Sequence, residues 1–190
     1  AEVLKKDLAK LGLVDLSLSD TSVLIGRLPA NLPAEFKGEL PMVGFIAHLD
    51  TVDVNLSPNI KPQIIKNYAG EDICLNKDQA IFIRVAEHPE LKKYIGQDII
   101  CSDGTSVLGA DNKAAIATML TTLEILQADK TLYHGELYFV FVPDEEVGLK
   151  GAKTIDFSKL PIDFAYTIDC CELGEVVYET FNAGSAIINI

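Results

Sequence analysis

Acidic side chains follow a wholly apolar stretch of this sequence at the point where the stretch ends. Residues 137–142 read Leu-Tyr-Phe-Val-Phe-Val and lead directly into Pro143-Asp144-Glu145-Glu146. An apolar stretch without a polar face predicts a strand that is buried on both sides inside an α/β sheet. Ligands bind beyond the carboxyl ends of strands in such sheets, which is where these acidic residues fall. Two adjacent glutamates on a turn can diverge, so that one binds a cation while the other transfers a proton, as hydrolytic metal chemistry requires.

Further positions extend this pattern. His48 and Asp50 end another predicted strand two residues apart, so an extended backbone directs both side chains the same way. Asp111 begins a predicted helix, and Asp169 ends a third predicted strand. Imidazole with carboxylates suits zinc, manganese or cobalt better than an iron–sulfur cluster or a structural zinc site. Each position alone has an ordinary explanation as a solvated turn, a core histidine or a helix cap. Their joint occurrence at ends expected to converge on one crevice favours a metal site.

The elements that must position these residues alternate along the chain. Periodicity predicts helices at 2–11 and 111–127, the second apolar on most faces and therefore mostly buried, and strands at 14–18, 23–28, 42–50, 135–142 and 164–169. The stretch from Val54 to Ser102 is irregular, with a short helix after Pro89. After Cys171 the half-buried alternation at 175–182 and 185–190 predicts antiparallel strands of a second domain.

Composition excludes several classes of function. The formal net charge of −12 and the lack of clustered Lys and Arg argue against nucleic acid and against anionic membranes as partners. The sequence contains no apolar run long enough to span a bilayer and no signal-peptide pattern at its start. Four irregularly spaced cysteines do not form a secreted disulfide framework, so we expect a cytoplasmic protein.

Three motifs of this sequence resemble the signatures of the dinuclear zinc exopeptidases, in the same order. They are His48-Leu49-Asp50-Thr51-Val52, Gly109-Ala110-Asp111-Asn112-Lys113-Ala114-Ala115 and Pro143-Asp144-Glu145-Glu146-Val147-Gly148. Within that family the chain is similar to the tripeptide aminopeptidases of the peptidase T group. The stretch Pro62 to Ile73 is the most discriminating part of that similarity, because it lies in a loop without shared catalytic duty.

The resemblance implies a role for each residue of the motifs. His48 would bind one zinc ion and Asp169 would complete its shell, while Asp111 would bridge both ions and Glu146 would bind the second. Asp50 would lie behind His48 and fix the tautomer of its imidazole. Glu145 would be the general base that takes a proton from a metal-bridging water and delivers it to the leaving amine.

The resemblance also implies the fold, the activity and the partners. We expect an α/β catalytic domain with a mixed, largely parallel central sheet and helices on both faces, over residues 1–172. Residues 173–190 would begin a satellite α+β domain for lid closure and dimerisation. The implied activity is that of a metallo-aminopeptidase that releases the N-terminal residue of tripeptides with two Zn²⁺ ions, for which Mn²⁺ or Co²⁺ could substitute. Partners would be small peptides and a second copy of the chain.

The sequence departs from the family pattern at Asn112, where a second Asp is common, and at two further points that keep alternatives open. The family's last metal-ligating histidine has no counterpart, and both ends of the sequence look cut, so the chain resembles roughly the first half of the enzyme. A related dipeptidase, deacylase or carboxypeptidase with the same metals, or an inactive metal-binding fragment, are the alternatives. The pair Cys170 and Cys171 follows Asp169 where the family has small residues, and we interpret both as small buried side chains.

Overall fold

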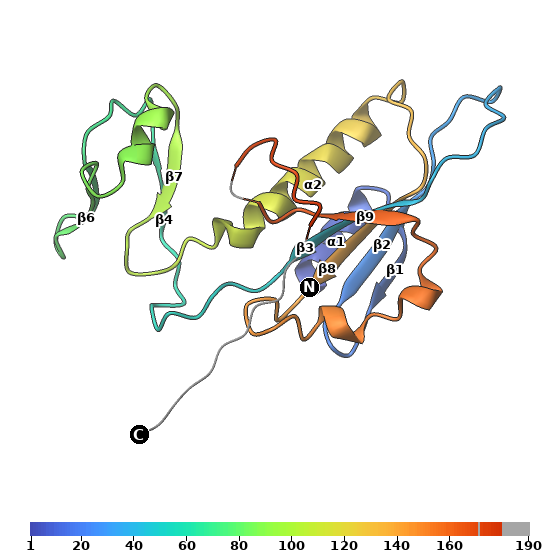
Figure 1. The fold of residues 1–190 in the computed structure, drawn as a ribbon, viewed down its shortest axis with the longest axis horizontal. Coiled ribbons are helices and arrows are strands. Elements are labelled where there is room, and N and C mark those ends of the chain that lie inside the picture. Colours follow the sequence, from blue (N-terminus) through green and yellow to red (C-terminus); the bar gives the residue numbers. More distant parts are fainter. Residues whose placement is uncertain (171, 180–190) are drawn as a thin grey trace.

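The computed structural model of the chain describes residues 1–170 and 172–179, and its centre is a mixed five-stranded sheet (Figure 1). Strand order across the sheet is β1-β2-β8-β3-β9. The strands are β1 (Val14–Leu18), β2 (Leu24–Leu28), β8 (Leu137–Val142), β3 (Val43–His48) and β9 (Phe164–Thr167). β8, β3 and β9 run parallel, whereas β1 and β2 pair antiparallel. The predicted α/β fold with a mixed sheet is confirmed.

Strand β8 lies in the middle of this sheet. It pairs with β2 on one side and with β3 on the other, so that Phe139 lies opposite Gly26 and Phe45. Residues 138–142 are all buried. This burial confirms that the apolar stretch is a strand covered on both faces, as a strand without a polar side must be.

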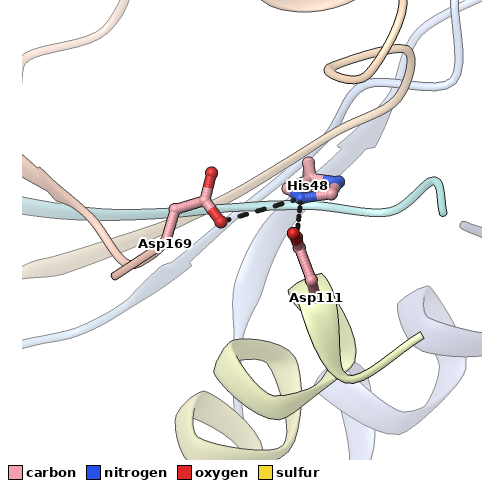
Figure 2. A group of neighbouring side chains, drawn as sticks. All are labelled: His48, Asp111 and Asp169. Atoms are coloured by element: carbon pink, nitrogen blue, oxygen red, sulfur yellow. Dashed lines mark hydrogen bonds and ion pairs between the residues drawn. The ribbon is translucent and has the colours of Figure 1, made fainter. Parts of the chain in front are cut away.

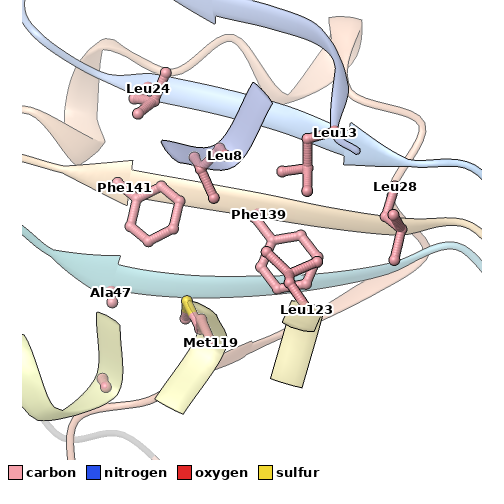
Figure 3. Close-up of a cluster of buried hydrophobic side chains, with 10 residues drawn as sticks. Leu8, Leu13, Leu24, Leu28, Ala47, Met119, Leu123, Phe139 and Phe141 are labelled. Carbon is pink, nitrogen blue, oxygen red and sulfur yellow. The ribbon is translucent and has the colours of Figure 1, made fainter. Parts of the chain in front are cut away.

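The two faces of the sheet are covered by different kinds of structure. The helices α1 (Glu2–Lys10) and α2 (Ala110–Ala128) pack on one face, where the main core forms (Figure 3). That core joins Leu8 of α1 and Leu123 of α2 to Phe139 and Phe141 of β8. The other face carries Val140 and Val142, which are packed against residues 152–162. This covering segment contains the short 3₁₀ helices η2 (Ala152–Thr154) and η3 (Phe157–Lys159).

Helix α2 buries only one stripe of its surface. Ala115, Met119 and Leu123, spaced four residues apart, lie against the sheet, whereas Ile125 is 52% exposed. The expectation that this helix is mostly buried is therefore wrong. Apolar residues on most faces indicate that a helix can be buried. The fraction of its surface that is buried depends on how many neighbouring layers pack against it.

The stretch predicted to be irregular folds into short strand pairs set apart from the main sheet (Figure 1). β4 (Pro62–Ile65) pairs with β7 (Ile99–Ser102), and β5 (Ile73–Asn76) pairs with β6 (Ile81–Ile83). The predicted helix after Pro89 is the 3₁₀ helix η1 (Pro89–Tyr94). Tyr68 is fully buried in this unit, and its hydroxyl donates to the carbonyl of Glu71 at 2.6 Å.

The predicted second-domain strands are only partly covered by the structure. The described residues 172–179 form no strand, so the strand expected from Glu175 is not found as far as Glu179. The remainder of that strand and the whole of 185–190 lie outside the described residues. Among the described helices, none combines the length and apolar character needed to cross a membrane.

Candidate metal centre

Three strand ends and one helix start supply the residues of the candidate site. β3 ends at His48 and is followed by Asp50, β8 is followed by Glu145 and Glu146, and β9 is followed by Asp169. Since these strands run parallel and adjacent, their carboxyl ends meet at one edge of the sheet. Helix α2 starts at the same edge and brings Asp111 to His48 (Figure 2). The predicted convergence is present.

The imidazole of His48 is the centre of the cluster. Only 2% of this residue is exposed. Its Nε2 lies 2.7 Å from Oδ1 of Asp111 and 3.8 Å from Oδ1 of Asp169 (Figure 2). Its Nδ1 faces the other way and lies 3.4 Å from Oδ1 of Asp50, without a hydrogen bond of good geometry. His48 thus presents one nitrogen to two carboxylates and the other to Asp50.

Asp50 has a second contact that sequence reasoning missed. The backbone N–H groups of Glu145 and Glu146 donate to its two carboxylate oxygens, each at 3.1 Å. Burial alone would raise the pKa of Asp50, but these two hydrogen bonds, together with the backbone N–H of Asp50 and the charge of His48, hold the pKa below its ordinary value. The Asp50 carboxylate therefore fixes the turn that carries both glutamates. Sequence shows the acidic turn, but not that two of its backbone amides bind a carboxylate 95 and 96 residues away.

Two groups of side chains have donor atoms close enough together to hold a metal ion. One consists of His48, Asp111 and Asp169, and the other of His48, Glu145 and Glu146. Within each group the donor atoms all lie within 4.8 Å of one another. The first group contains the ligands that the family resemblance implies for one ion. In the second group, the carboxylates of Glu145 and Glu146 both lie close to the imidazole of His48.

The charges at this edge favour a bound cation. Burial raises the pKa of Asp169, and the neighbouring Asp111 and Glu146 raise it further against the opposing effect of His48. Burial also raises the pKa of Glu145, against the lowering effect of His48, and the charges of Asp169, Glu146 and Asp50 add to the rise. Although burial lowers the pKa of His48, its hydrogen bond to Asp111 and the charges of the surrounding carboxylates raise it more. Carboxylates that repel one another beside an imidazole are a donor set that fits Zn²⁺, Mn²⁺ or Co²⁺.

The start of helix α2 is tied to two of the strand ends. Lys113 donates through Nζ to the carbonyl oxygen of Asp50 at 2.8 Å and to the hydroxyl of Thr51. Burial lowers the pKa of Lys113, against the effect of nearby carboxylates. The buried amide of Asn112 donates to the carbonyl of Ile168, one residue before Asp169, at 2.8 Å. Both residues follow Asp111 in the motif, but their partners are visible only in the structure.

The cysteine next to the site differs from expectation. Cys170 is exposed, and its thiol donates to a carboxylate oxygen of Glu175 at 2.9 Å. The interpretation as a small buried side chain is wrong for Cys170, because this residue is exposed to solvent. Cys171 lies outside the described residues.

A sheet that gathers one imidazole and several carboxylates at the carboxyl ends of parallel strands is typical of a metallohydrolase catalytic domain. The family model described as M42 glutamyl aminopeptidase matches residues 93–187, half of the chain. The chain belongs to this family.

Relatives extend the similarity to the whole sequence. A peptidase T-like protein of Yersinia pestis is 54% identical over all 190 residues, which cover 44% of that protein. Peptidase T of Caldanaerobacter subterraneus is 44% identical over 190 residues, covering 45% of its length. The resemblance to peptidase T expected from the motifs is thereby confirmed. The chain spans slightly less than half the length of these relatives.

Solved structures agree with this assignment. The aminopeptidase PepT of Bacillus cereus superimposes with a TM-score of 0.63 at 29% identity, over 89% of this chain and 37% of that one. A tripeptidase of Staphylococcus aureus gives a TM-score of 0.64 at 27% identity, over 90% of this chain and 37% of that one.

Proposed function

We propose that this chain carries catalytic residues of a metal-dependent aminopeptidase that releases the N-terminal residue of tripeptides. The observation that carries the proposal is the convergence of Asp111 and Asp169 on Nε2 of the buried His48, with the Glu145–Glu146 turn beside it. The similarity to peptidase T of Caldanaerobacter subterraneus and to the tripeptidase of Staphylococcus aureus supports the reaction and the substrate class.

The proposed metal shell uses the residues named by the family resemblance. His48, Asp111 and Asp169, whose donor atoms lie close together, would hold one Zn²⁺. Asp111 and Glu146 would hold a second, as the family resemblance implies, with Mn²⁺ or Co²⁺ as substitutes. When bound, two such cations polarise a scissile carbonyl and lower the pKa of a water molecule to roughly 7. Asp50, whose Oδ1 lies 3.4 Å from Nδ1 of His48, would orient the imidazole from behind.

Glu145 is the proposed general base. It lies on the turn that Asp50 fixes, and its carboxylate belongs to the group formed with His48 and Glu146. From there it would remove the proton of the attacking water and deliver it to the leaving amine. The surrounding carboxylates would attract the free α-ammonium group of a peptide substrate.

The organisation of the wider protein is part of the same proposal. Residues 1–172 would belong to the catalytic domain and 173–190 to the beginning of a satellite domain that supports homodimerisation. The irregular spacing of the four cysteines supports a cytoplasmic location.

A free N-terminus on the substrate is the feature that separates an aminopeptidase from the alternatives. We expect a free tripeptide to be hydrolysed at least about 100-fold faster than its N-acetylated form. Acetylation removes the α-ammonium group that the site carboxylates would bind, and a buried charge without its partner costs several kcal/mol. Chromatography measures the rate at which the full-length protein releases product from each of the two peptides. Prior removal of metal with a chelator should abolish hydrolysis, and Zn²⁺, Mn²⁺ or Co²⁺ should restore it. Faster hydrolysis of the acetylated peptide would instead identify a deacylase or carboxypeptidase.

A further inference from the structure

The side chain of Lys113 crosses from helix α2 to the segment that follows strand β3. It is half-buried, and its Nζ donates to the carbonyl oxygen of Asp50 at 2.8 Å and to the hydroxyl of Thr51. A lysine at the surface of a helix usually extends into water, because its ammonium group is strongly hydrated. Here both acceptors belong to the segment that follows His48.

This contact connects the separate parts of the site. On the helix side, Lys113 lies two residues after Asp111. On the strand side, it binds the backbone of Asp50, whose carboxylate receives the N–H groups of Glu145 and Glu146. Helix α2, the segment after β3 and the turn after β8 are therefore joined through two consecutive sets of hydrogen bonds.

The backbone next to Lys113 is shaped for this approach. Gly109 has a φ of +76°, and a Cβ built there would lie 3.0 Å from the Thr51 hydroxyl oxygen and 3.8 Å from Cε of Lys113. The glycine thus leaves the space in which Thr51 and the lysine side chain meet. A larger residue at this position would have to push Thr51 away from the helix.

We propose that Lys113 is a positioning residue of the metal centre, which holds the segment carrying His48 and Asp50 at a fixed distance from Asp111. The proposal rests on the proposed metallo-aminopeptidase function. Residues that hold metal ligands from outside have large effects, because a ligand shift of a fraction of an ångström weakens coordination. A different role for Lys113 would have the opposite effect on metal affinity. If the ammonium group acted only as a cation that competes with the metal, its removal would strengthen metal binding.

The test compares Lys113→Met with the unaltered full-length protein. Positioning predicts that the affinity for Zn²⁺, measured by competition with a chromophoric chelator, falls about 10- to 100-fold. At saturating Zn²⁺, kcat for a tripeptide should fall while KM stays within about twofold, because the lost contact orders catalytic groups and not the substrate. Lys113→Arg retains the charge and the donors and should recover part of both losses. Lys130→Met removes an exposed lysine just beyond the same helix and should change neither.

A second variant keeps the test valid if Lys113→Met does not fold. Thr51→Val removes one acceptor and preserves the side-chain shape, and it should lower Zn²⁺ affinity about 3- to 10-fold, the effect of one hydrogen bond. Unchanged or higher Zn²⁺ affinity in folded Lys113→Met, or in Thr51→Val when the first variant is unfolded, overturns the proposal. A different result, in which the unaltered protein neither binds Zn²⁺ nor cleaves peptides, would contradict the proposed function itself.

Discussion

Replacing Glu145 by glutamine is expected to lower kcat for tripeptide hydrolysis by about 10²- to 10⁴-fold, while the metal ions stay bound. Glutamine has the same shape but cannot accept a proton at neutral pH. The backbone N–H of Glu145 still donates to Asp50, so the turn should keep its conformation. Steady-state kinetics and metal content per protein, measured on the same preparation, check both parts of the expectation.

The neighbouring residue Asp144 offers a matched control. It is exposed and adopts a φ of +60°, a conformation that asparagine tolerates well. Asp144→Asn removes the same charge from the same turn and should leave kcat and metal content within about twofold. Unchanged turnover in Glu145→Gln would remove this residue as the base. Loss of metal together with activity would instead make Glu145 a ligand, since its carboxylate also lies near His48 and Glu146.

Replacing Asp111 by asparagine is expected to abolish activity through loss of metal. The carboxylate of Asp111 lies 2.7 Å from Nε2 of His48, and it is the residue proposed to contact both ions. An amide carries no negative charge and is a poorer ligand for Zn²⁺ than a carboxylate. The affinity for Zn²⁺ should therefore fall further than it does when a residue that only supports a ligand is replaced, which is about 10- to 100-fold. Titration calorimetry with Zn²⁺ and activity at increasing Zn²⁺ measure the effect.

Folding should not complicate the Asp111 experiment. The Asp111 side chain is 72% exposed, so its replacement leaves the core of the sheet untouched. Glu124→Gln, on the exposed surface of the same helix, removes an equal charge and should bind Zn²⁺ as the unaltered protein does. Normal Zn²⁺ binding by Asp111→Asn would show that this residue is not a ligand.

The sequence was sufficient to predict which candidate site residues lie at the ends of strands and at the start of a helix. The apolar strands before Asp50 and Glu145 contain six residues each, enough for their pattern to identify them, and the carboxyl ends of parallel strands meet at one edge of a sheet. Strand β9 before Asp169 contains only four residues, all exposed, so its pattern was a weaker signal. The same reasoning placed Asp111 at the start of a helix. These predictions depend on local patterns and on a general rule of α/β sheets.

Other features could not be predicted, because they depend on contacts between distant segments. Strands β4 to β7 contain only three or four residues each, too few for periodicity to distinguish them from loops. The hydrogen bonds from Lys113 to Asp50 and Thr51 join residues 63 and 62 positions apart. The partial burial of α2 depends on how many layers surround it. None of these contacts leaves a local pattern in the sequence.

His48 stands at the centre of the proposed metal site. Anomalous diffraction at the zinc edge, from crystals of the full-length protein grown with Zn²⁺, would locate the ions around this residue. We expect one anomalous peak between Nε2 of His48 and the carboxylates of Asp111 and Asp169, and a second next to Asp111 and Glu146. Absence of density at this edge of the sheet in crystals that contain Zn²⁺ elsewhere would contradict the proposed site.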